Sequence, residues 1–443
     1  MVPISKNTTI FFTIFTFLFF YSYLSISFAK KNTKRHATKV TRTFSGQIDL
    51  CLDCHEEEPD KAHGRQVISC SSCHLGNPLA ATPFEAHKDM VLNPGELTIA
   101  HKTCGQEGCH VSQLKWVKNT LMATNRGIIS TLRYYWGETD DQNEKLTVWM
   151  LKESSKTSLA IDYFKKLCGT CHLYLERHKL PGFLAEKGGG CTACHYKRPK
   201  NERSFKGHPK ITKAIPMENC VRCHNRSGRI GLTYQGLYES EGYGTPFDEG
   251  DTSKEQLEDG RFVQKISPDV HFEKGLVCID CHNKKELMGD GRQRAHLYEQ
   301  VEIECTTCHS GPDILRTILI ESRDPKQKFP KLTNLVEVNG KIFLKGKSDG
   351  KLHPLNKFSK DKCKDKDHSR LSCQACHSKW VPQCYGCHVK YDKSEKQLDK
   401  LTLKETFGKW EEFKSFMRYE DPVLGVLEDS SKEGSKIVIL VPG

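Results

Sequence analysis

Cysteine and histidine recur together along this chain in a fixed order. The 443 residues include 21 cysteines and 20 histidines, and nine times a histidine directly follows the second cysteine of a Cys-x-x-Cys unit. A tenth unit is stretched, because four residues separate its two cysteines. Numbered one to ten along the chain, the cysteine pairs are Cys51 and Cys54, Cys70 and Cys73, Cys104 and Cys109, Cys168 and Cys171, Cys191 and Cys194, Cys220 and Cys223, Cys278 and Cys281, Cys305 and Cys308, Cys373 and Cys376, and Cys384 and Cys387. The histidines that close these sites are, in the same order, His55, His74, His110, His172, His195, His224, His282, His309, His377 and His388.

This spacing is the attachment signature of c-type haem. The two thiols would bind one porphyrin covalently, and the adjacent histidine would ligate its iron. Zinc is the alternative, but zinc sites need four ligands and do not require a histidine after every second cysteine. Many cysteines in an exported chain usually indicate disulfides, which this regular spacing argues against. The sequence therefore predicts about ten covalently attached haem c groups, with Gly105 and Gly108 letting the stretched loop bulge.

The remaining histidines are as numerous as the sites. Most of them precede a haem site by a few residues, so we expect them to supply the second axial ligand of each iron. These candidate distal ligands are His36, His63, His87, His101, His178, His208, His271, His296, His353 and His368. His36 is the weakest, because it lies in a lysine-rich stretch after the N-terminal apolar segment. If His36 does not bind, one iron would take Met, Lys, water or Cys363 as its second ligand. Cys363 is the cysteine outside the ten sites, and it could equally be a free thiol.

The N-terminus predicts export. Lys6 precedes a nearly uncharged apolar run over 10–26, and Ser27 and Ala29 place small residues before a cleavage point, so residues 1–29 read as a signal peptide. An uncleaved anchor is the alternative, since the run is nearly long enough to span a bilayer. No later segment of the sequence is comparably apolar. We expect a periplasmic or otherwise extracytoplasmic protein, with the cell surface as the alternative location.

Composition leaves little material for an ordinary core. Apolar residues make up 37% of the chain, below the roughly 45–50% of typical domains. Porphyrin faces would then fill the interior, and we expect a mainly α, haem-packed fold with much irregular structure, short helices and one or two small β-hairpins. The net charge of +12 does not indicate nucleic acid, because ten haems, each with two propionates, would contribute about −10 when ferric and about −20 when ferrous.

Four regions follow from the distribution of the sites. We predict a signal peptide (1–29), an N-terminal region with six haems (30–225), a C-terminal region with four haems and a hairpin insertion (226–390), and a haem-free tail (391–443). Apolar spacing predicts a helix from Val111 to Leu121, and an Asn-Gly turn predicts a hairpin over 336–344. We expect a loop over 225–277. In the tail, we expect an amphipathic helix that carries Trp410, Phe413, Phe416, Met417 and Tyr419.

On these motifs, residues 48–390 resemble the exported multihaem cytochromes c of bacteria. The segment from Asp269 to His282 is similar to a recurring unit of that group. The resemblance implies electron transfer with redox protein partners, such as a quinol-oxidising membrane complex or other cytochromes. The group also contains enzymes similar to hydroxylamine oxidoreductase and to nitrite and tetrathionate reductases. This chain lacks the Cys-x-x-Cys-Lys site of one such enzyme class, and Tyr391 is a weak counterpart of a catalytic tyrosine crosslink.

Two functions remain open at this point. The first is an electron carrier whose irons all have two histidine ligands. The second is an oxidoreductase that acts on a small nitrogen or sulfur compound at one open haem. Equal numbers of sites and spare histidines favour the carrier, so we assign no catalytic residue. Tyr234, Tyr238 and Tyr243 invite an active-site interpretation, but packing of these rings on porphyrin is the stronger one.

Overall fold

The fold was analysed in a computed structural model. It describes residues 41–42, 48–55, 57, 59–64, 66–154, 157–198, 207–225, 230–239, 254–257, 261–358, 368–377, 383–384, 388–413, 417–418, 423–427 and 435–439. The predicted signal peptide, His36, Tyr243, Cys363 and Cys387 lie outside these residues.

The chain divides into two compact units, one of residues 1–71 and 76–88 and one of residues 72–75 and 89–443. In the first unit, β1 (Thr41–Arg42) pairs antiparallel with β2 (Ile48–Asp49). The other elements described there are η1 (Cys51–Asp53), η2 (Lys61–His63) and α3 (Pro83–Ala86), and α2 (Cys70–His74) begins in this unit and ends in the second. The boundaries that we predict at 225/226 and 390/391 stay predictions.

Short helices make up the first half of the second unit. They are η3 (Ala100–Lys102), α4 (Val111–Lys118), α5 (Leu121–Thr124), α6 (Arg126–Tyr135), α7 (Val148–Glu153), α8 (Leu159–Tyr163), the π-helical turn η4 (Phe164–Cys168), η5 (Gly182–Glu186), α9 (Cys191–His195) and α10 (Met217–Val221). Hydroxyl side chains begin several of them. Thr120, Thr147 and Ser158 accept backbone N–H groups at the starts of α5, α7 and α8. The helix predicted from Val111 is confirmed as α4, although it ends before Leu121.

The second half of this unit mixes short helices with small sheets. Its helices are α11 (Ile230–Thr233), α12 (Val270–Glu273), α13 (Cys278–Cys281), α14 (Lys284–Met288), α15 (Leu297–Gln300), α16 (Cys305–His309), α17 (Pro312–Arg323) and α19 (Gln374–His377). Its strands, after β3 (Tyr196–Lys197) and β4 (Lys210–Ile211), are β5 (Leu237–Glu239), β6 (Lys254–Gln256), β7 (Phe262–Lys265), β8 (Leu335–Val338), β9 (Lys341–Lys345), β10 (Leu352–Pro354), β11 (Gln383–Cys384), β12 (His388–Asp399), β13 (Lys404–Phe413), β14 (Met417–Arg418), β15 (Leu424–Leu427) and β16 (Lys436–Ile439).

The predicted hairpin is confirmed, whereas the loop and the tail helix are wrong where the structure describes them. β8 and β9 pair around Asn339 and Gly340, which have φ angles of 50° and 73°. The sheet order β5-β7-β6 occupies part of the expected loop. The tail forms the β12–β13 hairpin, in which Trp410 faces Tyr391. Gly408, at φ 91°, has the left-handed conformation that breaks a helix.

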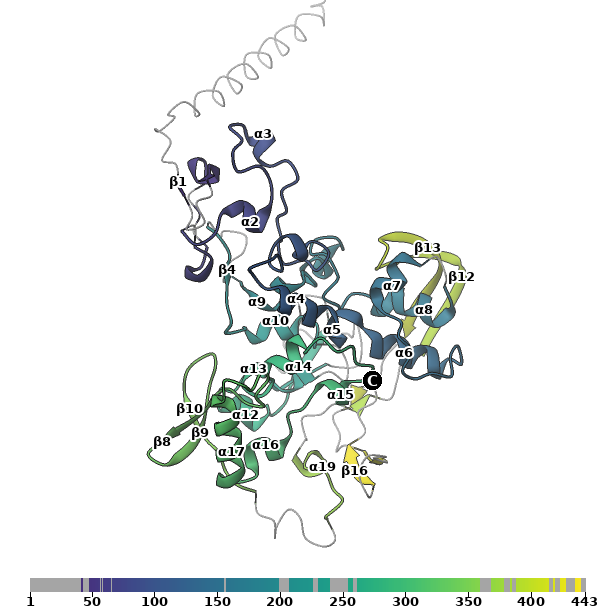
Figure 1. The fold of residues 1–443 in the computed structure, drawn as a ribbon. Helices are drawn as coiled ribbons and strands as arrows, with labels where there is room; N and C mark the ends of the chain where they lie inside the picture. The colour runs from purple at the N-terminus through teal and green to yellow at the C-terminus, as the bar shows by residue number, and fades with distance from the viewer. Residues whose placement is uncertain are drawn as a thin grey trace, which may run out of the picture. The chain divides into compact units, whose positions relative to one another are not determined.

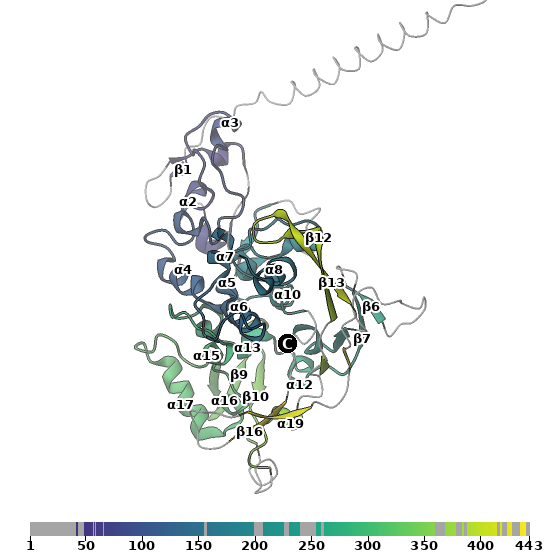
Figure 2. The ribbon, with the colours of Figure 1, turned by 90° about the vertical axis from the view of Figure 1, so that its right-hand side faces the viewer.

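Three small clusters form the side-chain core. In one, α17 buries Leu315, Ile318 and Leu319 at helical spacing against the sheet formed by β8, β9 and β10. In another, α6, α7 and α8 bury apolar side chains with Leu401 of the tail. Figures 1 and 2 show both arrangements, with α17 beside the sheet and the β12–β13 hairpin beside α7 and α8. Each cluster is small, as the low apolar content predicts.

A buried ion pair attaches the tail hairpin to α8. The Lys166 side chain is fully buried, and its Nζ lies 2.8 Å from Asp162 Oδ1. The same Nζ donates to the carbonyls of Phe407 and Gly408 at 2.6 and 2.5 Å, and Trp410 Nε1 donates to Asp162 Oδ2 at 2.8 Å. The charges are therefore satisfied on both sides of the contact.

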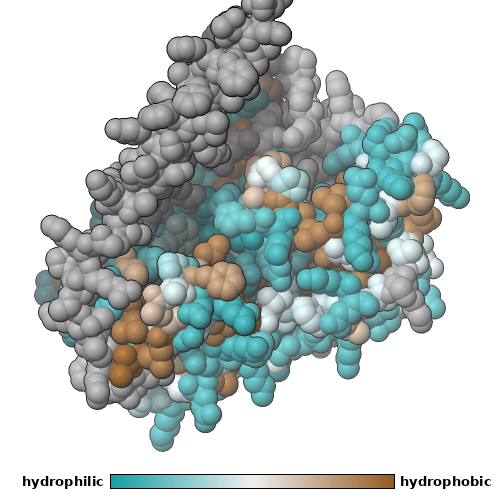
Figure 3. Space-filling model, turned by 90° about the horizontal axis from the view of Figure 1, so that it is seen from above, coloured by the Kyte–Doolittle hydropathy of each residue, from teal (hydrophilic) through white to brown (hydrophobic). Residues whose placement is uncertain are grey.

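The surface mixes apolar and polar side chains. Phe84, Leu92 and Tyr298 are each more than three-quarters exposed. The face in Figure 3 shows brown apolar patches interspersed with teal hydrophilic ones. Within the part of the chain that the structure describes, no helix has the length and hydropathy required to cross a bilayer.

Candidate haem-attachment sites

Several attachment units fold wholly or partly as a single helical turn. Sites two, five and eight are the helices α2, α9 and α16 in full, and parts of sites one, six, seven and nine are helical as well. In site seven, for example, His282 N donates to Cys278 O at 2.9 Å. A helical turn places residues i, i+3 and i+4 on one face. The two thiols and the histidine of a unit therefore face the same side, as one porphyrin would require.

The stretched third site closes in the same way. His110 N donates to Cys104 O at 3.0 Å, although two more residues intervene than in the other units. The additional residues are accommodated at Gly108, where the backbone has a φ of 79° and no atom lies near the position of a Cβ. This geometry returns the histidine to the first cysteine, so site three fits the chemistry of the other sites.

Several site histidines are held through Nδ1, which leaves Nε2 available. Nδ1 of His74, His195 and His309 bonds the carbonyls of Val91, Thr212 and Asn356, at 2.8, 2.9 and 2.6 Å respectively. Nδ1 of His282 bonds Glu286 Oε2 at 2.9 Å. Iron- and zinc-binding histidines are oriented in this manner, because the acceptor fixes both the tautomer and the ring.

Three site histidines face a candidate distal histidine. The ring centroids of His55 and His87 are 6.0 Å apart, those of His74 and His208 are 5.9 Å apart, and those of His271 and His309 are 6.2 Å apart. Two imidazoles on opposite faces of one iron have centroids about 6 Å apart, since each bond is about 2 Å and each centroid lies about 1 Å beyond its nitrogen. The distances therefore fit two ligands of a single iron.

In two of these pairs the distal partner is also anchored through Nδ1. His208 Nδ1 lies 2.6 Å from Pro209 O, and His271 Nδ1 lies 2.9 Å from Asp269 Oδ1. All four rings of these pairs thus keep Nε2 free for a ligand. Site eight takes its partner from the segment just before site seven, a pairing that the sequence spacing does not indicate.

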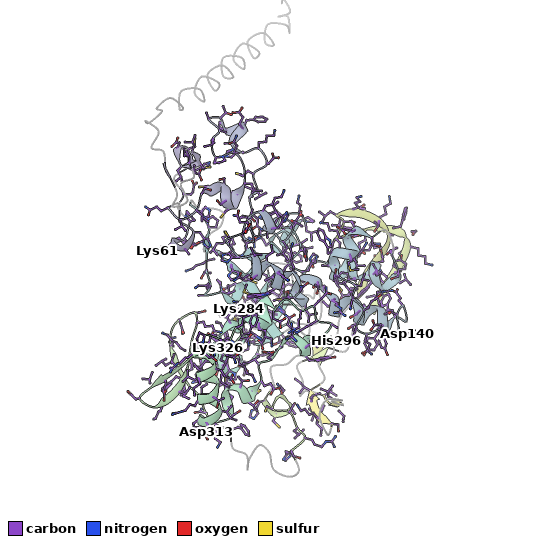
Figure 4. The ribbon with its side chains drawn as sticks, viewed as in Figure 1. Lys61, Asp140, Lys284, His296, Asp313 and Lys326 are labelled. Atoms are coloured by element: carbon purple, nitrogen blue, oxygen red, sulfur yellow. The ribbon has the colours of Figure 1, made fainter. Side chains whose placement is uncertain are left out.

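The other candidate distal histidines among the described residues lie in different local surroundings. His63 bonds Asp60 from η2, and His178 lies 3.7 Å from Glu186. His296 begins α15, where Figure 4 labels it, and stacks on Tyr298. His101 lies in η3, His353 in β10, and His368 in a turn before site nine.

Two buried imidazoles have nitrogens without a hydrogen-bond partner among the described residues. Both ring nitrogens of His172 and Nε2 of His353 are in this position. Burial lowers the pKa of His172 to about 4, so the ring is neutral at pH 7. A buried polar atom without a partner is costly. A bound iron would satisfy such a nitrogen, which supports His172 as a ligand.

Thiols of different sites lie against each other. The pairs within hydrogen-bonding reach are Cys51 with Cys70, Cys104 with Cys191, Cys171 with Cys223, Cys220 with Cys278, and Cys305 with Cys373. Cys281 and Cys308 are also close enough to interact. In addition, Asn219 Nδ2 of site six donates to Cys194 O of site five at 2.7 Å. Within the second unit, these contacts connect sites three, five, six, seven, eight and nine in sequence, with site four beside site six.

The thiols do not gather as zinc ligands do. The one group of three potential metal ligands that converges among the described residues is Asp49, Cys51 and Cys70. Its carboxylate instead accepts the backbone N–H groups of Cys51 and Cys70, at 2.9 and 2.6 Å. Burial, aided by Asp49, raises the pKa of Cys51 to about 12, which disfavours the thiolate that zinc needs. All 18 cysteines with described side chains are free of disulfides.

Guanidinium groups gather beside sites five and six. Arg198 and Arg222 both reach Glu186 Oε2, at 2.8 and 3.4 Å. Arg177 lies close to Arg198. Burial lowers the pKa of Arg177 most, and the positive charge of Arg198 lowers it further. Three cations thus surround one carboxylate. The surplus positive charge suits the propionates that each haem would bring.

Buried carboxylates surround site seven. Asp280 Oδ2 accepts Val277 N at 2.8 Å, and the Glu286 side chain is 1% exposed. Burial opposes ionisation of Glu286, but hydrogen bonds from His282 and from the backbone of Glu302 and Ile303 outweigh it and lower its pKa. The carboxylate is therefore ionised at neutral pH.

The candidate catalytic tyrosines have structural contacts. Tyr234 donates to Leu276 O at 3.0 Å, Tyr238 is buried at 3% exposure, and the Tyr391 ring packs at a tilt of 33° against Trp410 with centroids 4.4 Å apart. In site ten, Cys384 ends β11 and His388 begins β12, and the side chains of this site lie outside those described.

The acceptors that hold the histidines are the residues that sequence reasoning missed. Asp269 stands two residues before His271 and Glu286 four after His282, so a search for carboxylates next to candidate ligands could have found them. The carbonyl acceptors leave no trace in residue type. No protein-family model, curated protein or solved structure matches this chain. Its function is therefore inferred from its own residues.

Proposed function

We propose that this protein is an exported multihaem cytochrome c that transfers electrons between redox protein partners through haems ligated by two histidines. The observation that carries the proposal is the contact between neighbouring attachment units, from Cys104 against Cys191 to Cys305 against Cys373. Each of these thiols would hold the edge of a cofactor. Haem iron supplies reversible one-electron chemistry when bound.

The chain's own residues would provide attachment, ligation and spacing. The helical turns would fix the thiol pairs that they hold, and the acceptors at Nδ1 would fix the imidazoles of His74, His195, His282 and His309, so little could move there when the charge changes. The paired rings at sites one, two and eight would occupy both axial positions of those irons. Guanidinium groups such as Arg198 and Arg222 would balance propionate charge. These features favour transfer between proteins over reaction with a small substrate.

Intact mass and ligand binding together test the proposal. Protein exported from cells with cytochrome c maturation should exceed the mature polypeptide by ten haem masses, and reduction of disulfides should remove none of them. Carbon monoxide added to the reduced protein should change the spectrum little. Bare polypeptide, or bound zinc, would refute the haem assignment. One carbon monoxide per protein, with turnover of hydroxylamine, nitrite or tetrathionate, would favour the oxidoreductase.

A further inference from the structure

Glu286 is a buried carboxylate that holds a site histidine, whereas Glu57, whose carboxylate lies 3.4 Å from Nδ1 of His55 in site one, is 44% exposed. At His74, His195 and His309 the acceptor of Nδ1 is a neutral carbonyl, whereas at His282 it is a carboxylate at 2.9 Å. A carboxylate acceptor makes the imidazole a more basic ligand. A more basic ligand favours the ferric ion, which carries the larger positive charge.

The Glu286 carboxylate is also held rigidly and away from water. Its Oε1 accepts the N–H groups of Glu302 and Ile303, both at 2.6 Å, and its Oε2 accepts Asn283 N at 3.3 Å. Asn283 Oδ1 in turn accepts Glu286 N, which completes a capping box at the start of α14. A charge fixed in low dielectric acts more strongly than one in water.

Comparable carboxylates are more exposed. Asp269 beside His271 and Asp60 beside His63 have side chains that are 8% and 17% exposed, against 1% for Glu286. Water screens an exposed charge, so their effect should be weaker.

The nearby charges leave site seven net negative. Asp280, within the site, is 1% exposed, and its Oδ1 accepts Lys347 N at 2.7 Å. The Lys347 ammonium donates to Ile279 O and opposes the two carboxylates. Two negative charges and one positive charge therefore lie around His282.

We propose that Glu286 sets the potential of the site-seven haem and makes it the lowest among sites two, five, seven and eight. This inference rests on the proposed function. Within the succession of contacts, site seven lies between sites six and eight. Electrons would then cross an internal low-potential site rather than run down a uniform slope, and the rate of through-transfer would depend on that one carboxylate.

Glu286→Gln tests the inference, because glutamine keeps the shape and the oxygen that accepts Glu302 N and Ile303 N but removes the charge. Spectroelectrochemical titration should show one component, equivalent to one haem, moving to a higher potential, with the other components in place. Asp60→Asn makes the same chemical change at an exposed site and should produce a smaller shift. Lys347→Met should move one component, equivalent to one haem, to a lower potential, which tests the inference separately if Glu286→Gln fails to fold.

Haem content by intact mass separates the two proposals. If ten haems are present and no component changes its potential in either Glu286→Gln or Lys347→Met, the role of Glu286 is refuted while the cytochrome stands. An Asp60→Asn shift as large as that of Glu286→Gln would also refute it. If no haem is present, the proposed function itself fails.

Discussion

Replacing histidines singly and in pairs determines which two imidazoles share an iron. Their rings are 6.2 Å apart, so His271 and His309 should bind the same iron. His271→Ala should convert one haem in ten to a high-spin form that binds one carbon monoxide. Since covalent attachment depends on the cysteines, the haem content should stay at ten.

The double variants give the decisive count. In His271→Ala/His309→Ala both losses fall on one iron, so one haem in ten should still be affected. In His271→Ala/His282→Ala the losses fall on different irons, and two in ten should be affected. Low-spin signals in the ferric electron-spin spectrum should therefore fall by about one tenth and about one fifth respectively.

A reversed pattern would refute the pairing. If His271 instead served the site that follows it in sequence, the variant that also lacks His282 would lose one low-spin haem and the variant that also lacks His309 would lose two. The pair His74 and His208 is a matched control, because its rings are 5.9 Å apart and it should behave as His271 and His309 do.

Three further predictions concern attachment and stability. Cys104→Ser/Cys109→Ser should lower the intact mass by one haem; an unchanged mass would remove the stretched site from the set. Lys166→Met should leave the Asp162 carboxylate unpaired and lower the opening free energy of the β12–β13 hairpin by about 3–5 kcal/mol in native-state hydrogen exchange, whereas unchanged protection would contradict the buried pair. Hydrogen bonds from its arginine partners hold the pKa of Asp290 below its usual 3.8, so its stabilisation should be complete above that pH and lost progressively below it. Acid titration of unfolding should be less steep in Asp290→Asn, and equal slopes would count against this role.

Local features were predictable from the sequence, and long-range ones were not. The hairpin over 336–344 depends on an Asn-Gly turn and alternating strands within nine residues, and it formed as expected. The tail was mistaken for a helix because its aromatic spacing fits a helical stripe as well as a strand. The strand is stabilised by contacts with residues far away in the sequence, because Trp410 packs against Tyr163 and Trp136.

The candidate sites divide in the same way. Each attachment unit is a few residues long, so residue type and spacing are enough to predict it. The partner of a site histidine depends on the tertiary fold, which is why His271 could be recognised as a candidate ligand but not matched to His309. Residues that accept a hydrogen bond from Nδ1 through a backbone carbonyl could not be predicted, because every residue offers the same carbonyl group. Only the tertiary packing decides which carbonyl meets the ring.

The pairing of His74 with His208 has a consequence for biogenesis. An exported chain emerges from its N-terminus, so the first of these residues reaches the outside long before the second. Until then, imidazoles nearer in sequence, such as His63, His87 and His101, could occupy the vacant position. Final assembly would require such a substitute to leave, and contacts between distant residues form late in folding. We expect maturation of this chain to pass through transiently mispaired forms, and a slow exchange of imidazoles rather than cofactor attachment to limit how quickly the finished protein appears.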